Sequence, residues 1–283
     1  MDKHRSTRIG SRGSSLAMAQ AHRIQALFND KGVEASICVI QTVGDTQPDP
    51  IHLMGGKGVF VKDIEQALLD HDIDVAVHSF KDITSIPDHQ LIYSGFVLEE
   101  RPTDAIILFD TNNMNQSALR LATGSMRRKA LCQHLYPNIE CISIRGNIDT
   151  RIEKAKALNY DGLILSTAGL QRLKMTHLIS YEPDPIHFVP APGQGMLAIQ
   201  NRKDDAALTE LVASITTPEA QQLGRYYVEF LKGIEFNCNH PLGAIIHNQE
   251  WRVFLGTNRA NYFNHPLHDV VGIVRRVKEC AHA

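Results

Sequence analysis

The chain has 283 residues, of which 43% are apolar, so it is long enough to form two or three hydrophobic cores. Lysine and arginine number 29 against 31 for aspartate and glutamate, and the net charge of -2 gives no general attraction to nucleic acid. No apolar run approaches the ~20 residues of a membrane helix, and the N-terminus lacks a signal peptide's apolar stretch. We therefore expect a cytoplasmic protein that contacts neither nucleic acid nor membrane.

A strand, a polar turn and a helix open the chain. Residues 6–9 are typical of a strand, the turn 10–15 follows, and the helix continues to Gln20. Arg12 and Ser14 stand in the turn, where a helix N-terminus offers backbone NH donors to an anion. Such turns are also common as simple helix caps, so both interpretations stay open.

Residues 57–82 combine an amphipathic helix with a short apolar strand at 73–77. Asp82 follows Lys81 just beyond this strand, where a carboxylate can be partly desolvated beside a cation. Such a group can stabilise or shuttle protons on a cationic intermediate. A helix N-cap is the alternative role, but Ile83–Pro87 does not begin a convincing helix, and we favour a functional role.

A second stretch, residues 105–187, alternates strands with helices. We expect strands at 105–109, 119–122, 140–144 and 162–166. The turns after two of these strands carry Arg127, Arg128 and Arg145, and Arg151 follows one helical turn later. Ligands of open α/β sheets collect at the carboxyl ends of the strands, so we expect these side chains to converge.

Arginine in these turns favours a carboxylate or phosphate ligand, because its planar fork donates two parallel hydrogen bonds. Any one of these arginines alone is more typically a solvated surface charge. Four together indicate a ligand with several negative groups.

The segment 189–195 is rich in proline and glycine and leads into the apolar run 196–199, so we expect the chain to re-enter its first domain there. A helix at 219–232, strands at 242–247 and 251–256 and an apolar run at 270–274 suit a small α+β domain. The alternation of elements predicts α/β domains with largely parallel sheets. The expected domains are 1–97 with 196–215, then 98–195, then 216–283.

The five cysteines show no CxxC pairing, and an odd number argues against a disulfide framework. Cys38, Cys132 and Cys141 fall within strand or helix patterns and are typical of core residues. Cys238 lies in a polar loop and is a better candidate attachment point, although such thiols are more often incidental. The 14 histidines give no ligand spacing, so we expect no metal.

Five motifs in order resemble the porphobilinogen deaminases over nearly the whole chain: Ile9–Ser14, Gly55–Lys62, Val77–Asp82, Arg145–Arg151 and Pro190–Gly195. The resemblance implies two α/β domains like type 2 periplasmic binding proteins, with the active site in the cleft between them. It also implies a small α+β C-terminal domain and a monomer.

The resemblance further implies a hydroxymethylbilane synthase, a transferase of tetrapyrrole (haem-type) biosynthesis that joins four porphobilinogens head to tail and releases ammonia. A dipyrromethane cofactor, bound by a thioether to Cys238, would prime the chain, and Asp82 would be catalytic. The implied cofactor-binding residues are Cys238, Lys81, Ser79, Ser125, Arg127, Arg128, Arg145 and Arg151. The implied substrate-binding residues are Arg12, Ser14, Gln20, Arg145, Arg151, Arg172 and Gln194.

Two alternatives stay open. Phe236–Asn237 stand where family members usually have two glycines, which is compatible with a divergent paralogue of low activity. A non-catalytic protein of the same fold that binds polycarboxylates or tetrapyrroles would need the arginines but neither Asp82 nor Cys238.

Overall fold

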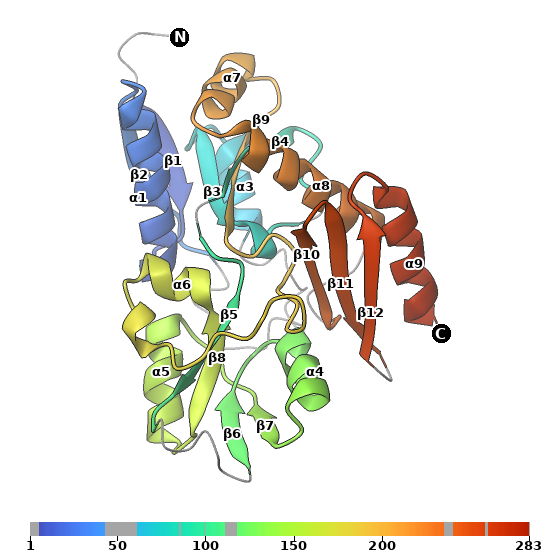
Figure 1. Ribbon diagram of the computed structural model, residues 1–283. Helices are drawn as coiled ribbons and strands as arrows, with labels where there is room; N and C mark the ends of the chain where they lie inside the picture. Colours follow the sequence, from blue (N-terminus) through green and yellow to red (C-terminus); the bar gives the residue numbers. More distant parts are fainter. Residues whose placement is uncertain are drawn as a thin grey trace. The chain divides into compact units, whose positions relative to one another are not determined.

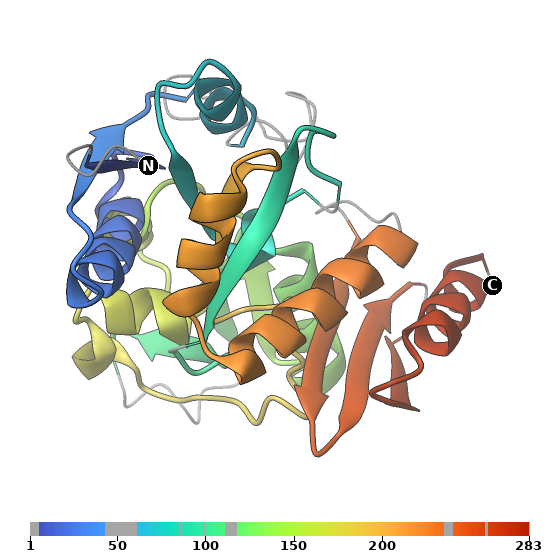
Figure 2. The ribbon, with the colours of Figure 1, turned by 90° about the horizontal axis from the view of Figure 1, so that it is seen from above.

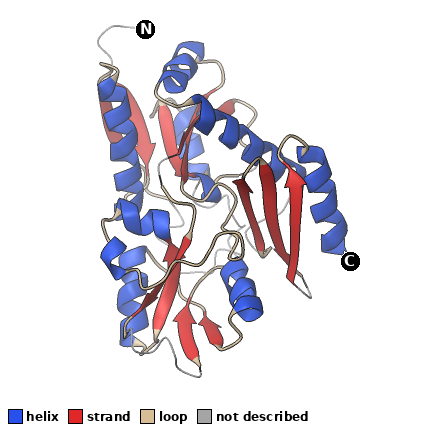
Figure 3. Ribbon diagram, viewed as in Figure 1, coloured by secondary structure: helices blue, strands red, loops and turns tan. Residues whose placement is uncertain are grey.

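The computed structural model describes residues 6–42, 61–84, 86–98, 100–110, 118–234, 240–257 and 260–282 (Figure 1). The chain forms two compact units. Unit 1 comprises Met1–Glu99 and Met196–Val228, and unit 2 comprises Glu100–Gly195 and Glu229–Ala283. Helices, blue in Figure 3, flank strands, red, in each unit, so the expected α/β architecture is confirmed.

Unit 1 is built on a five-stranded sheet with the order β2-β1-β3-β9-β4. Its strands are β1 (Thr7–Ser11), β2 (Ala35–Val39), β3 (Val75–Ser79), β4 (Leu91–Leu98) and β9 (Met196–Arg202). Its helices are α1 (Ser15–Asp30), α3 (Lys62–Leu69), α7 (Ala206–Ser214) and the first part of α8 (Pro218–Ile234), with a short 3-10 turn, η2, at Phe80–Asp82.

The alternation of side chains along β3 explains why helices cover both faces of this sheet. Val75 and Val77 point to a core that also contains Ile24 of α1 and Val212 of α7. Ala76 points to the other face and packs with residues of α3. A strand that is buried on both faces has apolar residues at successive positions, as β3 has here at Val75, Ala76 and Val77.

Strand β9 joins unit 1 from far along the chain, which confirms the predicted re-entry. It lies between β3 and β4 and is antiparallel to both, whereas β1 runs parallel to β2 and β3. Strand β4 therefore runs in the same direction as β1, β2 and β3, so the expectation of a largely parallel sheet is confirmed for unit 1, and β9 is the antiparallel strand among those described.

Unit 2 contains a four-stranded sheet with the order β5-β8-β6-β7 and a three-stranded sheet with the order β10-β11-β12. The strands are β5 (Asp104–Leu108), β6 (Leu119–Ala122), β7 (Ile139–Ile142), β8 (Gly162–Ser166), β10 (Leu242–His247), β11 (Glu250–Gly256) and β12 (Ala260–Pro266). The helices are α4 (Met126–Leu135), α5 (Ile148–Ala157), α6 (Thr167–Arg172) and α9 (Val270–His282), with a 3-10 turn, η4, at Thr176–Leu178.

One hydrophobic core joins the two sheets of unit 2. Leu131 and Cys132 of α4 pack with Ile164 of β8 and with Phe254 of β11. Helix α9 lies along β11 and β12, as Figure 2 shows from above. The C-terminal sheet is therefore part of unit 2, and its separate status as a third domain stays a prediction.

Within the described ranges, no helix is long and apolar enough to cross a membrane.

Candidate active site

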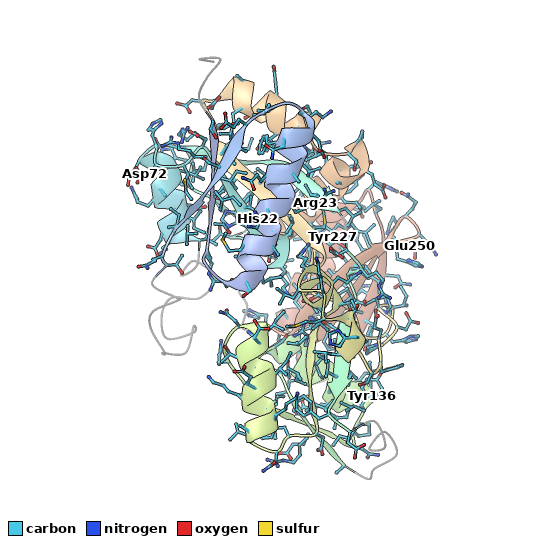
Figure 4. All side chains as sticks on the ribbon, turned by 90° about the vertical axis from the view of Figure 1, so that its left-hand side faces the viewer. His22, Arg23, Asp72, Tyr136, Tyr227 and Glu250 are labelled. Carbon is cyan, nitrogen blue, oxygen red and sulfur yellow. The ribbon has the colours of Figure 1, made fainter. Side chains whose placement is uncertain are left out.

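The expected catalytic segment of unit 1 lies directly after β3. Ser79 ends the strand, and Lys81 and Asp82 follow in η2. The Phe80 ring between them is fully buried, with its centroid 5.6 Å from that of Phe96 and 5.8 Å from that of Tyr227, a residue labelled in Figure 4. This aromatic cluster fixes the backbone that carries Lys81 and Asp82.

Asp82 is exposed, so the expected partial desolvation is not found and that expectation is wrong. In this segment the Phe80 ring is fully buried, whereas the Asp82 carboxylate is exposed to solvent. Its catalytic role stays a prediction.

Three expected substrate-binding residues of unit 1 gather around the start of α1. Ser14 caps this helix and accepts a hydrogen bond from the Ala17 amide at 3.3 Å, which is the capping role left open above. Gln20, one and a half turns into the helix, is buried and donates to the Ser79 hydroxyl at 2.7 Å. Arg12 is half-buried in the preceding turn. The structure thus joins Gln20 of the substrate set with Ser79 of the cofactor set.

A buried polar network lies under the same strand. His78 Nε2 lies 3.0 Å from Gln200 Oε1, and the Gln200 amide donates to Glu65 at 2.7 Å. Because the Gln200 nitrogen is directed at Glu65, its oxygen accepts from His78, which assigns the proton of the neutral imidazole to Nε2. Burial lowers the pKa of His78 to about 4 and raises that of Glu65.

The first turn of α4 in unit 2 holds Arg127 and Arg128, which are only 5% and 6% exposed. Both bind Asp104, the fully buried first residue of β5. Arg127 Nη1 donates to Oδ2 of this carboxylate at 2.7 Å. Arg128 donates to Oδ1 through Nε at 3.0 Å and Nη2 at 2.7 Å. The sequence predicted these arginines, but it did not predict the carboxylate between them.

The charges of this cluster do not balance. Two guanidinium groups face one carboxylate at a helix N-terminus, which itself has a positive dipole end. Burial alone would raise the pKa of Asp104, but the charges of Arg127 and Arg128 outweigh it and hold the pKa well below its ordinary value. Asp104 is therefore ionised at neutral pH, and the cluster retains one excess positive charge that suits an anionic ligand.

The remaining arginine turn lies between β7 and α5. Gly146 has a φ of +125°, a conformation that favours glycine, and its carbonyl accepts a hydrogen bond from Arg151 Nε at 2.6 Å. Asn147 caps α5 without a side-chain hydrogen bond to the helix, and Arg145 is exposed. The predicted strand-turn-helix context of Arg145 and Arg151 is thus confirmed, and their ligands stay a prediction.

Gln194 and Arg172 were expected to bind substrate, but the structure gives each a partner inside unit 2. Gln194 is buried, and its amide nitrogen donates to the carbonyls of Pro102 and Thr103 at 2.7 and 3.0 Å and to Asp104 at 3.1 Å. Arg172 Nη2 donates to the Gly195 carbonyl at 2.8 Å. The amide nitrogen of Gln194 is therefore committed to the segment around Asp104, whereas its Oε1 is buried and has no hydrogen-bond partner among the described residues.

Ser125 caps α4 and accepts a hydrogen bond from the Arg128 amide at 3.4 Å. Cys238, together with its neighbours 235–239, lies outside the described residues, as does most of the motif Gly55–Lys62. Among the described residues, no group of three His, Cys, Asp or Glu side chains could hold a metal ion.

Sequence reasoning missed Asp104 and His78. Asp104 directly precedes the apolar run 105–109, and a lone carboxylate at the start of a buried strand was the available signal. His78 continues the apolar run of β3, where a polar residue within a buried strand needs a hydrogen-bond partner.

Solved structures that the chain resembles include the methionine binding protein MetQ, with a TM-score of 0.47 and 11% identity, covering 79% of this chain and 95% of that chain. A periplasmic substrate-binding protein of an ABC transporter from Coxiella burnetii has a TM-score of 0.44 and 12% identity, covering 78% of this chain and 97% of that chain.

Other known proteins share a higher sequence identity with the chain than these solved structures do. A family model described as "Porphobilinogen deaminase, dipyromethane cofactor binding domain" matches residues 7–210. The porphobilinogen deaminase of Syntrophobacter fumaroxidans is 36% identical over 245 residues, covering 85% of this chain and 79% of that protein. A probable porphobilinogen deaminase of Methanocaldococcus jannaschii is 33% identical over 270 residues, which cover 95% of this chain and 92% of that protein. The chain therefore belongs to the porphobilinogen deaminase family.

Proposed function

We propose that this chain is a hydroxymethylbilane synthase, which joins four porphobilinogens head to tail with release of ammonia. Family membership supports this activity. The structural observation that carries it is the buried Arg127–Arg128–Asp104 cluster, which lies within the matched range 7–210 and has one uncompensated positive charge. Every pyrrole of the substrate bears an acetate and a propionate, so the ligand supplies the missing negative charge.

The donor set of unit 2 fits a dipyrromethane cofactor with several carboxylates. Arg127 and Arg151 lie in the first turns of α4 and α5, and Arg145 stands in the turn before α5, where guanidinium groups and helix N-termini both favour carboxylates. When bound through Cys238, the cofactor supplies the pyrrole end to which the first substrate is joined. In this proposal, Arg12, Ser14 and Gln20 hold the carboxylates of the incoming porphobilinogen.

Asp82 is the proposed catalytic residue. Its carboxylate stabilises positive charge that develops on a pyrrole nitrogen as ammonia leaves, and the buried Phe80 keeps the segment in place. Lys81 and Ser79 bind carboxylates beside it. We also propose that the enzyme acts as a cytoplasmic monomer, for which light scattering should give a mass near 31.6 kDa plus the cofactor.

The test of this function is the intact mass of the denatured protein after expression with porphobilinogen available. We expect an added mass equal to two linked pyrroles. The Cys238→Ser variant should lack this addition, and Cys38→Ser, which changes a half-buried thiol of β2, should keep it. A parent chain of unmodified mass would contradict the proposal and would favour a protein that only binds polycarboxylates.

A further inference from the structure

Two cysteines lie on either side of the short connection between α4 and β7 in unit 2, which consists of residues 136–138. The Tyr136 amide donates to the Cys132 carbonyl at 2.7 Å, and the Ile139 amide donates to the Tyr136 carbonyl at 2.9 Å. The chain therefore turns back directly after the helix. Cys132 lies in the last turn of α4, and Cys141 is near the end of β7.

The strand register places Cys141 on the face of the sheet that α4 covers. Cys141 pairs with Leu121 of β6, and paired residues on neighbouring strands point to the same side of a sheet. Leu121 is fully buried in the hydrophobic core that also contains Cys132, and Cys141 packs against that core. The backbone therefore directs both thiols into the space between α4 and β7.

The two thiols form a hydrogen bond, and their surroundings make them chemically different. Cys132 is fully buried, and the hydrogen bond to Cys141 raises its pKa, as burial also does. Cys141 is half-buried on the last strand of the order β5-β8-β6-β7. This hydrogen bond lowers the pKa of Cys141, with help from the charge of Lys129 and against the effect of partial burial. Cys141 is thus the more nucleophilic thiol, because the thiolate is the reactive form.

We infer that Cys132 and Cys141 form a redox-sensitive dithiol, a modification site at which a hydroperoxide oxidises Cys141 and Cys132 then closes a disulfide. The inference goes beyond the proposed function, which uses neither residue. The sequence predicts both as ordinary core cysteines, and the burial of Cys132 agrees with that. The contact between the two thiols and the partial exposure of Cys141 indicate the additional role.

The reaction balances with the hydroperoxide as the oxidant. The Cys141 thiolate attacks one oxygen of hydrogen peroxide, the O–O bond breaks, and with one proton taken up the products are a sulfenic acid and a water. The Cys132 sulfur then displaces the sulfenic hydroxyl, which leaves as a second water with the thiol hydrogen of Cys132. Two electrons pass from the thiols to the peroxide, and a dithiol reductant reverses the change. Transient, redox-sensing disulfides of this kind occur in reducing compartments.

The disulfide acts on the helix that carries the arginine cluster. Cys132 lies one helical turn beyond Arg128, and its thiol is close enough to Arg128 and Asp104 for their charges to affect it. A disulfide is only about 2.05 Å long, shorter than a hydrogen bond between thiols, so oxidation draws α4 toward β7. The modification therefore ties the helix with the arginine turn to the end strand of the sheet.

The sequence makes the test direct, because trypsin releases both cysteines in one peptide. No lysine or arginine lies between Lys129 and Arg145, so this peptide spans residues 130–145. The folded full chain is treated with hydrogen peroxide for increasing times, the remaining thiols are blocked with N-ethylmaleimide, and the digest is analysed by mass spectrometry. We expect the peptide to lose two hydrogens and to take up no maleimide. Cleavage after Glu140 should leave its two halves joined, and a dithiol reductant before blocking should restore both thiols.

Cys38 and Cys280 are internal controls, because both are half-buried like Cys141. We expect each to be oxidised at least ~10-fold more slowly than the pair, because reactivity follows thiolate character and exposure. Unfolding the chain in urea before the peroxide is added should narrow this difference, because the fold supplies the contact between the two thiols.

Two variants test the order of the steps. In Cys132→Ala, oxidation of Cys141 should stop at the sulfenic acid, which dimedone traps, because the thiol that condenses with it is gone. In Cys141→Ser, the buried Cys132 should stay reduced, and a dimedone adduct on it would overturn the assigned order. If peptide 130–145 of the parent still took up two maleimides once Cys38 and Cys280 were oxidised, the pair would be two core thiols without redox chemistry.

Discussion

At the scale of single residues, Asp82 carries the chemistry in the proposed function. We expect Asp82→Asn to keep the covalent cofactor, because its shape is preserved, and to lower kcat by ~100-fold or more, because the charge that stabilises the cationic pyrrole is lost. Porphobilinogen consumption and intact mass together test this. Asp72→Asn, an exposed residue in the turn before β3 and labelled in Figure 4, is the matched control and should turn over like the parent. If the Asp82→Asn enzyme turned over at the parent rate, Asp82 would have only a structural role.

His78 provides a second prediction at this scale. Its pKa, lowered by burial to about 4, lies below the ordinary value of 6.5, so the unfolded chain takes up a proton between these pH values and the folded chain does not. The free energy of unfolding should therefore fall as pH falls from 6.5 to 4, by up to about 1.4 kcal/mol per pH unit from this group.

Glu65 acts in the opposite sense, because a carboxyl with a raised pKa binds its proton more readily in the folded state. The His78→Gln variant retains Glu65, so the difference between parent and variant isolates the imidazole. Denaturant unfolding at pH 7 and pH 5 should show a steeper loss in the parent than in the variant. Equal losses would mean that His78 is protonated in the folded protein.

At the scale of elements, the contact between α8 and β4 supports the expected catalytic segment. A Cβ atom at Gly224 would meet the Phe96 ring, which in turn packs against Phe80 next to Asp82. Alanine is favoured over glycine in a helix by about 1 kcal/mol, but overpacking a core typically costs about 1–3 kcal/mol. We expect Gly224→Ala to lower Tm, with the exposed Arg225→Ala on the same helix as control. A rise in Tm would show that the ring moves aside.

Most elements could be predicted because their signals are local. The apolar runs at 119–122 and 162–166 are strands with those same bounds, and the helix expected at 219–232 is α8. Strand β12, with the sequence Ala-Asn-Tyr-Phe-Asn-His-Pro, was missed because it is only half-buried and carries polar residues that a local pattern assigns to loops. The direction of β9 depends on partners more than 90 residues away, which no local pattern encodes.

The candidate site could be predicted only in part for a similar reason. Turns rich in arginine indicated an anion site, and two of those arginines do bind a carboxylate, but it is Asp104 of the protein itself. Charge in the sequence shows which groups are available, whereas their partners depend on the packing of β5, α4 and the segment 189–194. The exposure of Asp82 likewise depends on the direction in which η2 turns.

At the scale of the whole molecule, neither unit is a continuous stretch of chain. Unit 1 needs β9, which lies between β3 and β4 but follows all of unit 2's first segment in the sequence. Non-local pairing of this kind delays folding, because a long loop must close before its contacts form. We expect pulsed hydrogen exchange during refolding to show the amides of β3, β9 and β4 gaining protection in one phase. Early protection of β4 alone would contradict this.

The excess charge of the arginine cluster also has a consequence for how the protein matures. A newly synthesised chain holds two buried guanidinium groups and one carboxylate, so its folded state is incomplete until an anion arrives. A ligand that binds only the folded state stabilises it, and a covalent ligand does so permanently. Under the proposed function, we therefore expect the unloaded chain to be the form most open to proteolysis, and the supply of pyrrole during synthesis to affect how much protein survives as well as how much is active.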